Sequence, residues 1–244
     1  MRPLAAAALL ALVLSAAQAE EAGTARELLG QLGGRTAVMT LHETPRPDGS
    51  ARLTGEYLIL PTLQLRYLEG ERSKQLGVTF LKEGHSPILY GRPGTATLQG
   101  TWSAGVFKGA RYAPGGQERE RFEFSEKFPS MADYSAEVRC KLEEGRYASV
   151  LQYEVRSGRL KSLDWSSRVE PSGHTCSVVA NEQAPLEGGL RFVSGRCHVT
   201  LRDLGEYVRV SALDCSEQCG SLAYLEPVLV ERGGGCLLLR PLSR

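Results

Sequence analysis

Six cysteines carry the most obvious chemistry of this sequence, and they all lie in its second half: Cys140, Cys176, Cys197, Cys215, Cys219 and Cys236. An even set of cysteines in an exported chain is typical of disulfides, so we expect all six to be paired. The sequence leaves the pairing open. Cys215 and Cys219, four residues apart, could lie on one helical turn and bridge two strands, with Cys197 and Cys236 as candidate partners, or could bond to each other.

Metal binding is the alternative use of these thiols. Cys215, Cys219 and Cys236 together with His198 would supply four ligands that suit zinc. Thiolates in an oxidising compartment tend to pair instead, so we predict neither a metal nor a cofactor.

Cys197 is also the best candidate for a nucleophile. The segment Ser194-Gly-Arg-Cys197-His198, with His174 upstream, resembles the Ser/Thr-His-Gly-Cys signature of the cell-wall L,D-transpeptidases, although the residues before the cysteine differ. The chain has no H-E-x-x-H pair, no G-x-S-x-G elbow and no Walker-type loop. We therefore assign no catalytic residue, expect His42 and His85 to be surface or structural residues, and keep a cysteine-dependent enzyme as an alternative.

The N-terminus has the three parts of a secretory signal peptide. Arg2 precedes an apolar run from Leu4 to Leu14, and Ala17-Gln18-Ala19 provides the small residues of a cleavage site. We expect residues 1–19 to be removed and the protein to be periplasmic or secreted. The apolar run is shorter than the ~20 residues of a membrane helix, so we predict no transmembrane segment.

The charge balance gives no support for a nucleic-acid partner. The chain has 29 basic and 28 acidic side chains, and loss of a leader containing Arg2 would make the two numbers equal. Nucleic-acid-binding domains usually carry a basic excess. We therefore expect an ordinary surface of mixed charge and no nucleic-acid binding.

The pattern of short apolar or alternating runs predicts an all-β protein with two packed antiparallel β domains of sandwich or barrel type, the second disulfide-bonded. The first would span 20–128 and the second 134–244. Thr24-Ala-Arg-Glu27 has the form of a capping box and predicts a short leading helix. Asp48-Gly49 predicts a tight hairpin, and Lys127–Asp133, which has no period, predicts the boundary.

Strand alternation also predicts which side chains are buried. Cys197, Val199 and Leu201 should point one way, and His198, Thr200 and Arg202 the other. The apolar runs Leu225–Glu231 and Cys236–Leu239 predict a hairpin covered on both faces or placed between the two halves. Three aromatics follow glycines, and they should either pack over them or line a ligand groove: Tyr57, Trp102 and Tyr112.

The segment Cys215-Ser-Glu-Gln-Cys219-Gly-Ser-Leu-Ala-Tyr224 resembles the ends of small exported β proteins of Gram-negative bacteria, which are mostly uncharacterised and some of which are lysozyme-inhibitor-like. Val193-Ser-Gly-Arg-Cys197 lacks the tyrosine of the Ser-Gly-x-x-Tyr loop that such inhibitors use, so no inhibitory residue is transferred.

The sequence as a whole predicts an exported, non-enzymatic envelope protein that binds a protein or an envelope glycan. A purely structural envelope component is a further alternative. The aromatic-bearing strands and the loop Asn181–Gly189 are the expected ligand sites, and the oligomeric state stays open.

Overall fold

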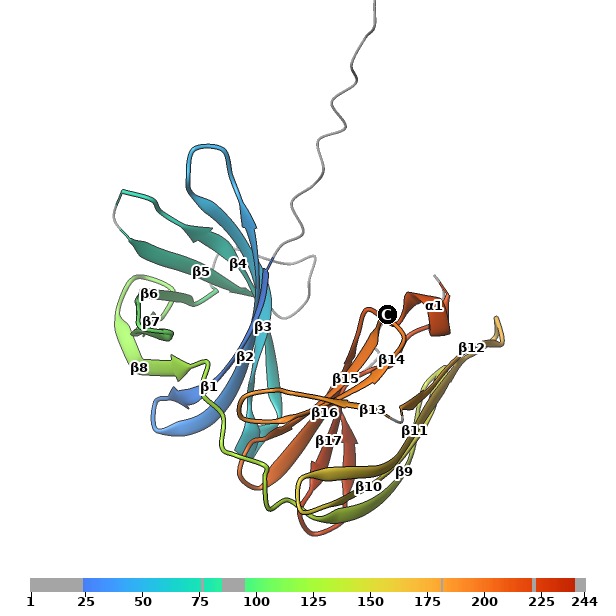
Figure 1. The fold of residues 1–244 in the computed structure, drawn as a ribbon. Coiled ribbons are helices and arrows are strands. Elements are labelled where there is room, and N and C mark those ends of the chain that lie inside the picture. The colour runs from blue at the N-terminus through green and yellow to red at the C-terminus, as the bar shows by residue number, and fades with distance from the viewer. Residues whose placement is uncertain (1–23, 76, 85–94, 181, 221–222, 240–244) are drawn as a thin grey trace, which may run out of the picture.

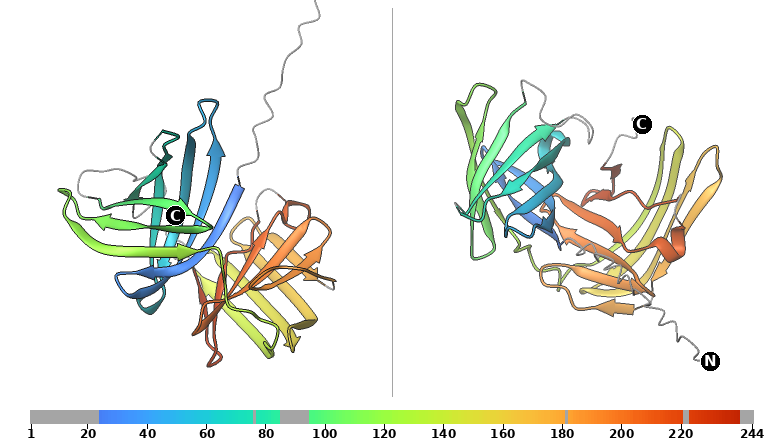
Figure 2. Two further views of the ribbon diagram at one scale, coloured as in Figure 1. Left: turned by 60° about the vertical axis from the view of Figure 1, so that its left-hand side comes forward. Right: turned by 90° about the horizontal axis from the view of Figure 1, so that it is seen from above.

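The computed structural model describes residues 24–75, 77–84, 95–180, 182–220 and 223–239. The chain forms a closed barrel followed by two stacked sheets (Figures 1 and 2). The predicted all-β class and the disulfide bonding of the second domain are thus confirmed. The predicted signal peptide, 1–19, and His85 lie outside the described residues. Within those residues, no helix has the length and apolar character of a membrane span.

Eight antiparallel strands form the barrel. They are β1 (Thr24–Leu32), β2 (Arg35–Pro45), β3 (Ala51–Ile59), β4 (Gln64–Arg72), β5 (Val78–Gly84), β6 (Thr97–Ser103), β7 (Val106–Tyr112) and β8 (Glu118–Ser125), with a short 3-10 helix, η1 (Leu60–Thr62), after β3. Each strand pairs with the next in the chain, and β1 also pairs with β8 and closes the barrel. Closure leaves the barrel no free sheet edge.

The prediction of a leading helix is wrong, because Thr24–Leu32 is strand β1. It pairs with β2 along its full length and with β8 over its second half. Leu28 and Leu32 are buried inside the barrel, which a strand achieves as readily as a helix because their spacing is even. Two neighbouring strands satisfy the backbone here, so the local capping pattern does not decide the structure.

The barrel interior is filled by side chains. Its apolar part includes the aromatics Phe107, Phe122 and Phe124, whose neighbouring ring centroids lie 4.8 and 5.8 Å apart. A Cβ added at Gly100 would lie 2.8 Å from the rings of both Phe107 and Phe122, so these rings cover the bare glycine. Tyr57 is buried as well. The barrel thus has a packed core where a ligand cavity would otherwise lie.

The second domain contains a sheet of four strands and a sheet of six. The first is formed by β9 (Ala136–Glu144), β10 (Tyr147–Arg156), β11 (Arg159–Val169) and β12 (His174–Ala180). The second is formed by β13 (Glu182–Ala184), β14 (Leu190–Ser194), β15 (Cys197–Asp203), β16 (Tyr207–Leu213), β17 (Val228–Glu231) and β18 (Cys236–Leu238), with a helical turn, α1 (Ser216–Cys219). Both sheets contribute to one apolar core around the fully buried Trp165. The segment 126–135, between β8 and β9, contains no strand.

All six cysteines form disulfides, as their even number predicts: Cys140–Cys236, Cys176–Cys219 and Cys197–Cys215. Of the two candidate partners for Cys215 and Cys219, Cys197 is confirmed because it bonds to Cys215, whereas Cys236 bonds to neither and is wrong, as is the alternative of a direct Cys215–Cys219 bond. Cys219 ends α1, which packs beside β12 and its Cys176, while Cys236 begins β18, which packs beside β9 and its Cys140. The Cys140–Cys236 bond joins the two sheets.

The hairpin β17–β18 serves two cores at once. Val228 and Val230 point into the core of the second domain, whereas Leu229 and Leu237 pack into a cluster between the domains. That cluster also contains barrel and linker residues: Leu29, Val38, Leu58, Leu60, Leu65 and Phe128. The predicted hairpin between the halves is thus confirmed, and it fixes one end of the domain interface.

Candidate functional site

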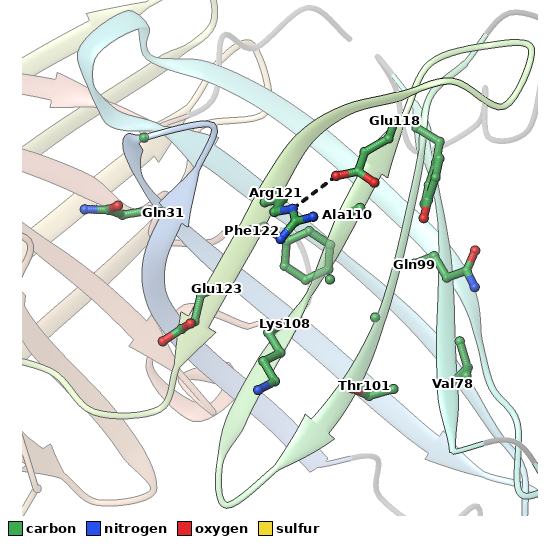
Figure 3. A pocket seen from close by; sticks show the side chains of 14 residues that line it. Gln31, Val78, Gln99, Thr101, Lys108, Ala110, Glu118, Arg121, Phe122 and Glu123 are labelled. Carbon is green, nitrogen blue, oxygen red and sulfur yellow. Dashed lines mark hydrogen bonds and ion pairs between the residues drawn. The ribbon is translucent and has the colours of Figure 1, made fainter.

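One hollow, of about 780 Å³, lies on the outer surface of the barrel over β6, β7 and β8 (Figure 3). Gln99, Thr101 and Lys108 line it and are exposed. At its other end, Arg121 donates a hydrogen bond to Glu118 across 3.2 Å, and both side chains are exposed. These polar side chains are open to solvent, so the hollow does not offer the enclosed surroundings that are usual for a ligand site.

A second hollow, of about 510 Å³, lies between the two domains, and we call it the interdomain groove. Strand pairing explains its barrel wall. The outward apolar residues Leu29, Val38 and Leu58 are aligned across β1, β2 and β3 and belong to the cluster between the domains. Because outward residues recur every second position, the next outward row is Glu27, Thr40 and Glu56, and it faces the groove.

The second domain, which we call the sandwich because its two sheets are stacked, provides the other wall, and outward residues alternate there in the same way. Arg202 and Arg209 are aligned on β15 and β16, and Arg191, Thr200 and Ser211 form the next row across β14, β15 and β16. All five residues line the groove. The predicted alternation in β15 is confirmed, because Cys197, Val199 and Leu201 are fully buried while His198, Thr200 and Arg202 are partly exposed.

The deepest polar layer of the groove joins the two domains electrostatically. The Oε2 atom of Glu27 lies 3.3 Å from Arg202 Nε, and its Oε1 atom lies 3.5 Å from Arg209 Nη1. Arg209 Nη1 also donates a hydrogen bond to Thr40 Oγ1 over 3.1 Å. Arg202 is held further by the ring of Phe128, 4.5 Å from its guanidinium carbon. One carboxylate from the barrel is thus shared by two arginines of the sandwich.

Two histidines from different domains, His42 on β2 and His198 on β15, line the outer part of the groove. His42 is exposed and His198 is partly buried. Two polar atoms near them have no hydrogen-bond partner among the described residues, although both are buried: His198 Nδ1 and Arg209 Nε. Buried polar groups are nearly always hydrogen-bonded in proteins, so this wall still has unused capacity for polar contacts.

The structure does not provide the geometry that the two cysteine-based alternatives, a nucleophilic Cys197 and a zinc site, would require. Cys197 is fully buried and bonded to Cys215, so a nucleophilic role would first require this disulfide to open. The zinc set is dispersed, because Cys215, Cys219 and Cys236 belong to three different disulfides. Across the described parts of the chain, no group of three or more histidine, cysteine or acidic side chains could hold a metal ion.

Most of the aromatic side chains that were expected to bind a ligand instead pack against other residues of the barrel. Tyr57 is buried in the barrel, and Trp102 is stacked on Phe107 with a centroid distance of 5.0 Å. Tyr112 lines the hollow on the outer barrel. Part of the predicted loop Asn181–Gly189 is strand β13, and Asn181 lies outside the described residues. The interdomain groove was not predicted, although the outward alternation of β15 pointed to one of its walls.

Comparison with protein-family models, with curated proteins and with solved structures found no match.

Proposed function

We propose that this protein is an exported binding protein of the cell envelope and that its ligand occupies the interdomain groove. The observation that carries the proposal is the construction of this groove. Two walls from separate domains present arginine, histidine and hydroxyl side chains to a common space of about 510 Å³, a volume within the usual range for ligand sites. Domain interfaces are also a preferred location for such sites.

The disulfides support the location in the envelope. Three disulfide bonds are typical of proteins that fold in an oxidising compartment, and the N-terminus, which resembles a signal peptide, agrees with a location outside the cytoplasm. With Cys197 bonded and buried, binding fits the groove better than thiol chemistry does. The ligand would be a protein segment or an envelope glycan.

Blocking the groove with a large side chain tests the proposal. We expect Thr200→Trp to abolish retention of the ligand from an envelope extract by the immobilised protein. Thr200 lies in the middle of the sandwich wall, where its hydroxyl is hydrogen-bonded to that of Ser211 across 2.8 Å. Hydrogen exchange should show that the extract protects β15 and β16 in the wild-type protein only.

The matched control is Thr101→Trp, which introduces the same ring into the hollow on the outer barrel. It should leave retention unchanged. Loss of retention in Thr101→Trp alone would move the site to the barrel and contradict the proposal. Absence of any retained component would favour a structural envelope protein. Circular dichroism and thermal unfolding of both variants show whether either substitution disturbs the fold.

A further inference from the structure

We infer that the interdomain groove holds its ligand by an anionic group, a carboxylate or a phosphate, placed between Arg209 and Arg191. This inference rests on the proposed function, because it names the chemistry of the ligand in that groove.

The charges of the groove favour an anion. Three arginines and two glutamates line it, so positive charge is in excess even with both histidines neutral. In the deepest layer, the single carboxylate of Glu27 serves both Arg202 and Arg209. One further negative charge would balance this pair. The rigid fork of the arginine guanidinium matches carboxylate and phosphate oxygens well.

Arg209 is the anchor of this site. It is only 6% exposed, yet its Nε has no hydrogen-bond partner among the described residues. The same guanidinium uses Nη1 for Thr40 and Glu27. A buried arginine with an unused donor is destabilising unless another group accepts from it. An anion bound at the floor of the groove would supply both the acceptor and the counter-charge.

Arg191 lies on β14, two strands away from Arg209 of β16 and in the neighbouring outward row, and it lines the same groove. It is partly buried, and the structure gives it no hydrogen bond or ion pair with any described residue. The hydroxyls of Thr200 and Ser211 continue its cross-strand row. Among the described lining residues there is no phenylalanine, tyrosine or tryptophan, so only the small imidazole rings of His42 and His198 could stack on an uncharged sugar ring. Charge-assisted hydrogen bonds are therefore the strongest contacts that this groove offers.

Titration of the intact protein with simple anions tests the inference. Inorganic phosphate and succinate are added at constant ionic strength, and binding is followed by calorimetry. We expect saturable binding of at least one anion, and the comparison of the two separates phosphate from carboxylate recognition. Arg191→Gln should weaken that binding by about tenfold or more, because it removes a charged hydrogen-bond donor. The control Arg196→Gln should not change it, since Arg196 is exposed in the β14–β15 turn and does not line the groove.

Equal affinity of the wild type and Arg191→Gln, or no saturable binding of either anion, would overturn the inference. The envelope extract separates this failure from failure of the proposed function. If Thr200→Trp loses the retained component and Arg191→Gln keeps it, the groove binds a ligand without the anion contact. If both variants retain it as the wild type does, the groove is not the binding site and both proposals fail.

Discussion

Glu83 is the residue on which the polar part of the barrel interior depends. It is 4% exposed and accepts hydrogen bonds from Tyr57 Oη at 2.6 Å and from Arg111 Nε and Nη2 at 2.7 and 3.0 Å. Arg111 also contacts Glu120, which pairs with Arg35. Burial, and next the charge of Glu83, raises the pKa of Tyr57 far above its ordinary value. The phenol therefore keeps its proton and remains a donor to the carboxylate.

This shift predicts a loss of stability in alkali. Burial also raises the pKa of Tyr153. Above about pH 10 these tyrosines ionise in the unfolded chain but stay protonated in the folded protein. The unfolded state then binds fewer protons, so the free energy of unfolding falls as the pH rises, by about 1.4 kcal/mol per pH unit for each tyrosine.

Urea unfolding between pH 8 and pH 11 measures this effect. Tyr57→Phe should make the slope above about pH 10 shallower by the contribution of one tyrosine, while the slope near pH 8 should stay as in the wild type. An unchanged alkaline slope in Tyr57→Phe would show that this phenol titrates alike in both states.

At the scale of the element, strand β1 determines whether the barrel closes. Gly30 lies between Ala37 of β2 and Phe124 of β8. A Cβ at position 30 would lie 2.0 Å from the backbone oxygen of Glu123. Any side chain here would push β8 away from β1. The absence of a side chain at this position is therefore a requirement of the closed barrel.

We expect Gly30→Ala to lower the free energy of unfolding by about 3 kcal/mol, at the upper end of the usual cost of overpacking. The control is Gly233→Ala, because a Cβ at position 233 meets no atom within 4 Å. It should change stability little. Chemical denaturation of both variants, followed through Trp102 in the barrel and Trp165 in the second domain, provides the measurement, and equal stability of the two variants would contradict the required close approach of β1 and β8.

Local patterns predicted the elements that local chemistry determines. Asp48-Gly49 forms the predicted hairpin between β2 and β3, with Gly49 at a φ of +81° and Asp48 Oδ1 accepting from the Ser50 amide. The alternation of buried and partly exposed side chains along β15 was likewise predicted from the sequence. β1 was not, because its strand conformation depends on pairing with β8, which follows in the chain only after six further strands. The disulfide partner of Cys219 was missed for the same reason, since which elements pack together is decided by the tertiary fold.

The candidate site was hidden more completely. Its central ion pair joins Glu27 to Arg202, 175 residues apart in the sequence, and no periodicity links two strands of different domains. Each wall is an ordinary outward face, and the two walls are brought together by the apolar cluster around Leu229 and by the ion pairs of Glu27. The sequence therefore predicted the polarity of one wall and gave no sign of the groove.

At the scale of the molecule, covalent cross-links are confined to one domain. All three disulfides lie in the sandwich, and the barrel has none. The two tryptophans of the chain report on the domains separately, because Trp102 packs on the barrel core and Trp165 is buried in the sandwich. This distribution makes the response of each domain to reductant measurable.

We expect reductant to lower the unfolding temperature of the sandwich much more than that of the barrel. Loss of the Cys140–Cys236 bond, with a sequence separation of 96, should cost roughly 4–5 kcal/mol, and loss of Cys197–Cys215, with a separation of 18, about 3 kcal/mol. Fluorescence of Trp102→Phe and Trp165→Phe variants, with and without reductant, follows the two domains. A single shared transition shifted equally in both variants would mean that the barrel cannot remain folded without the sandwich.

The final hairpin gives the molecule a direction of assembly. The barrel is closed by a strand that ends at Ser125, so its pairing is complete once the first half of the chain has emerged. The sandwich instead needs Cys236 for its bond to Cys140 and Leu237 for its contact with the barrel. During N-to-C synthesis or translocation, the groove between the domains is consequently the last feature to form. A chain that stopped just before Cys236 would keep a complete barrel while losing the cross-link between the sheets and part of the seal at the base of the groove.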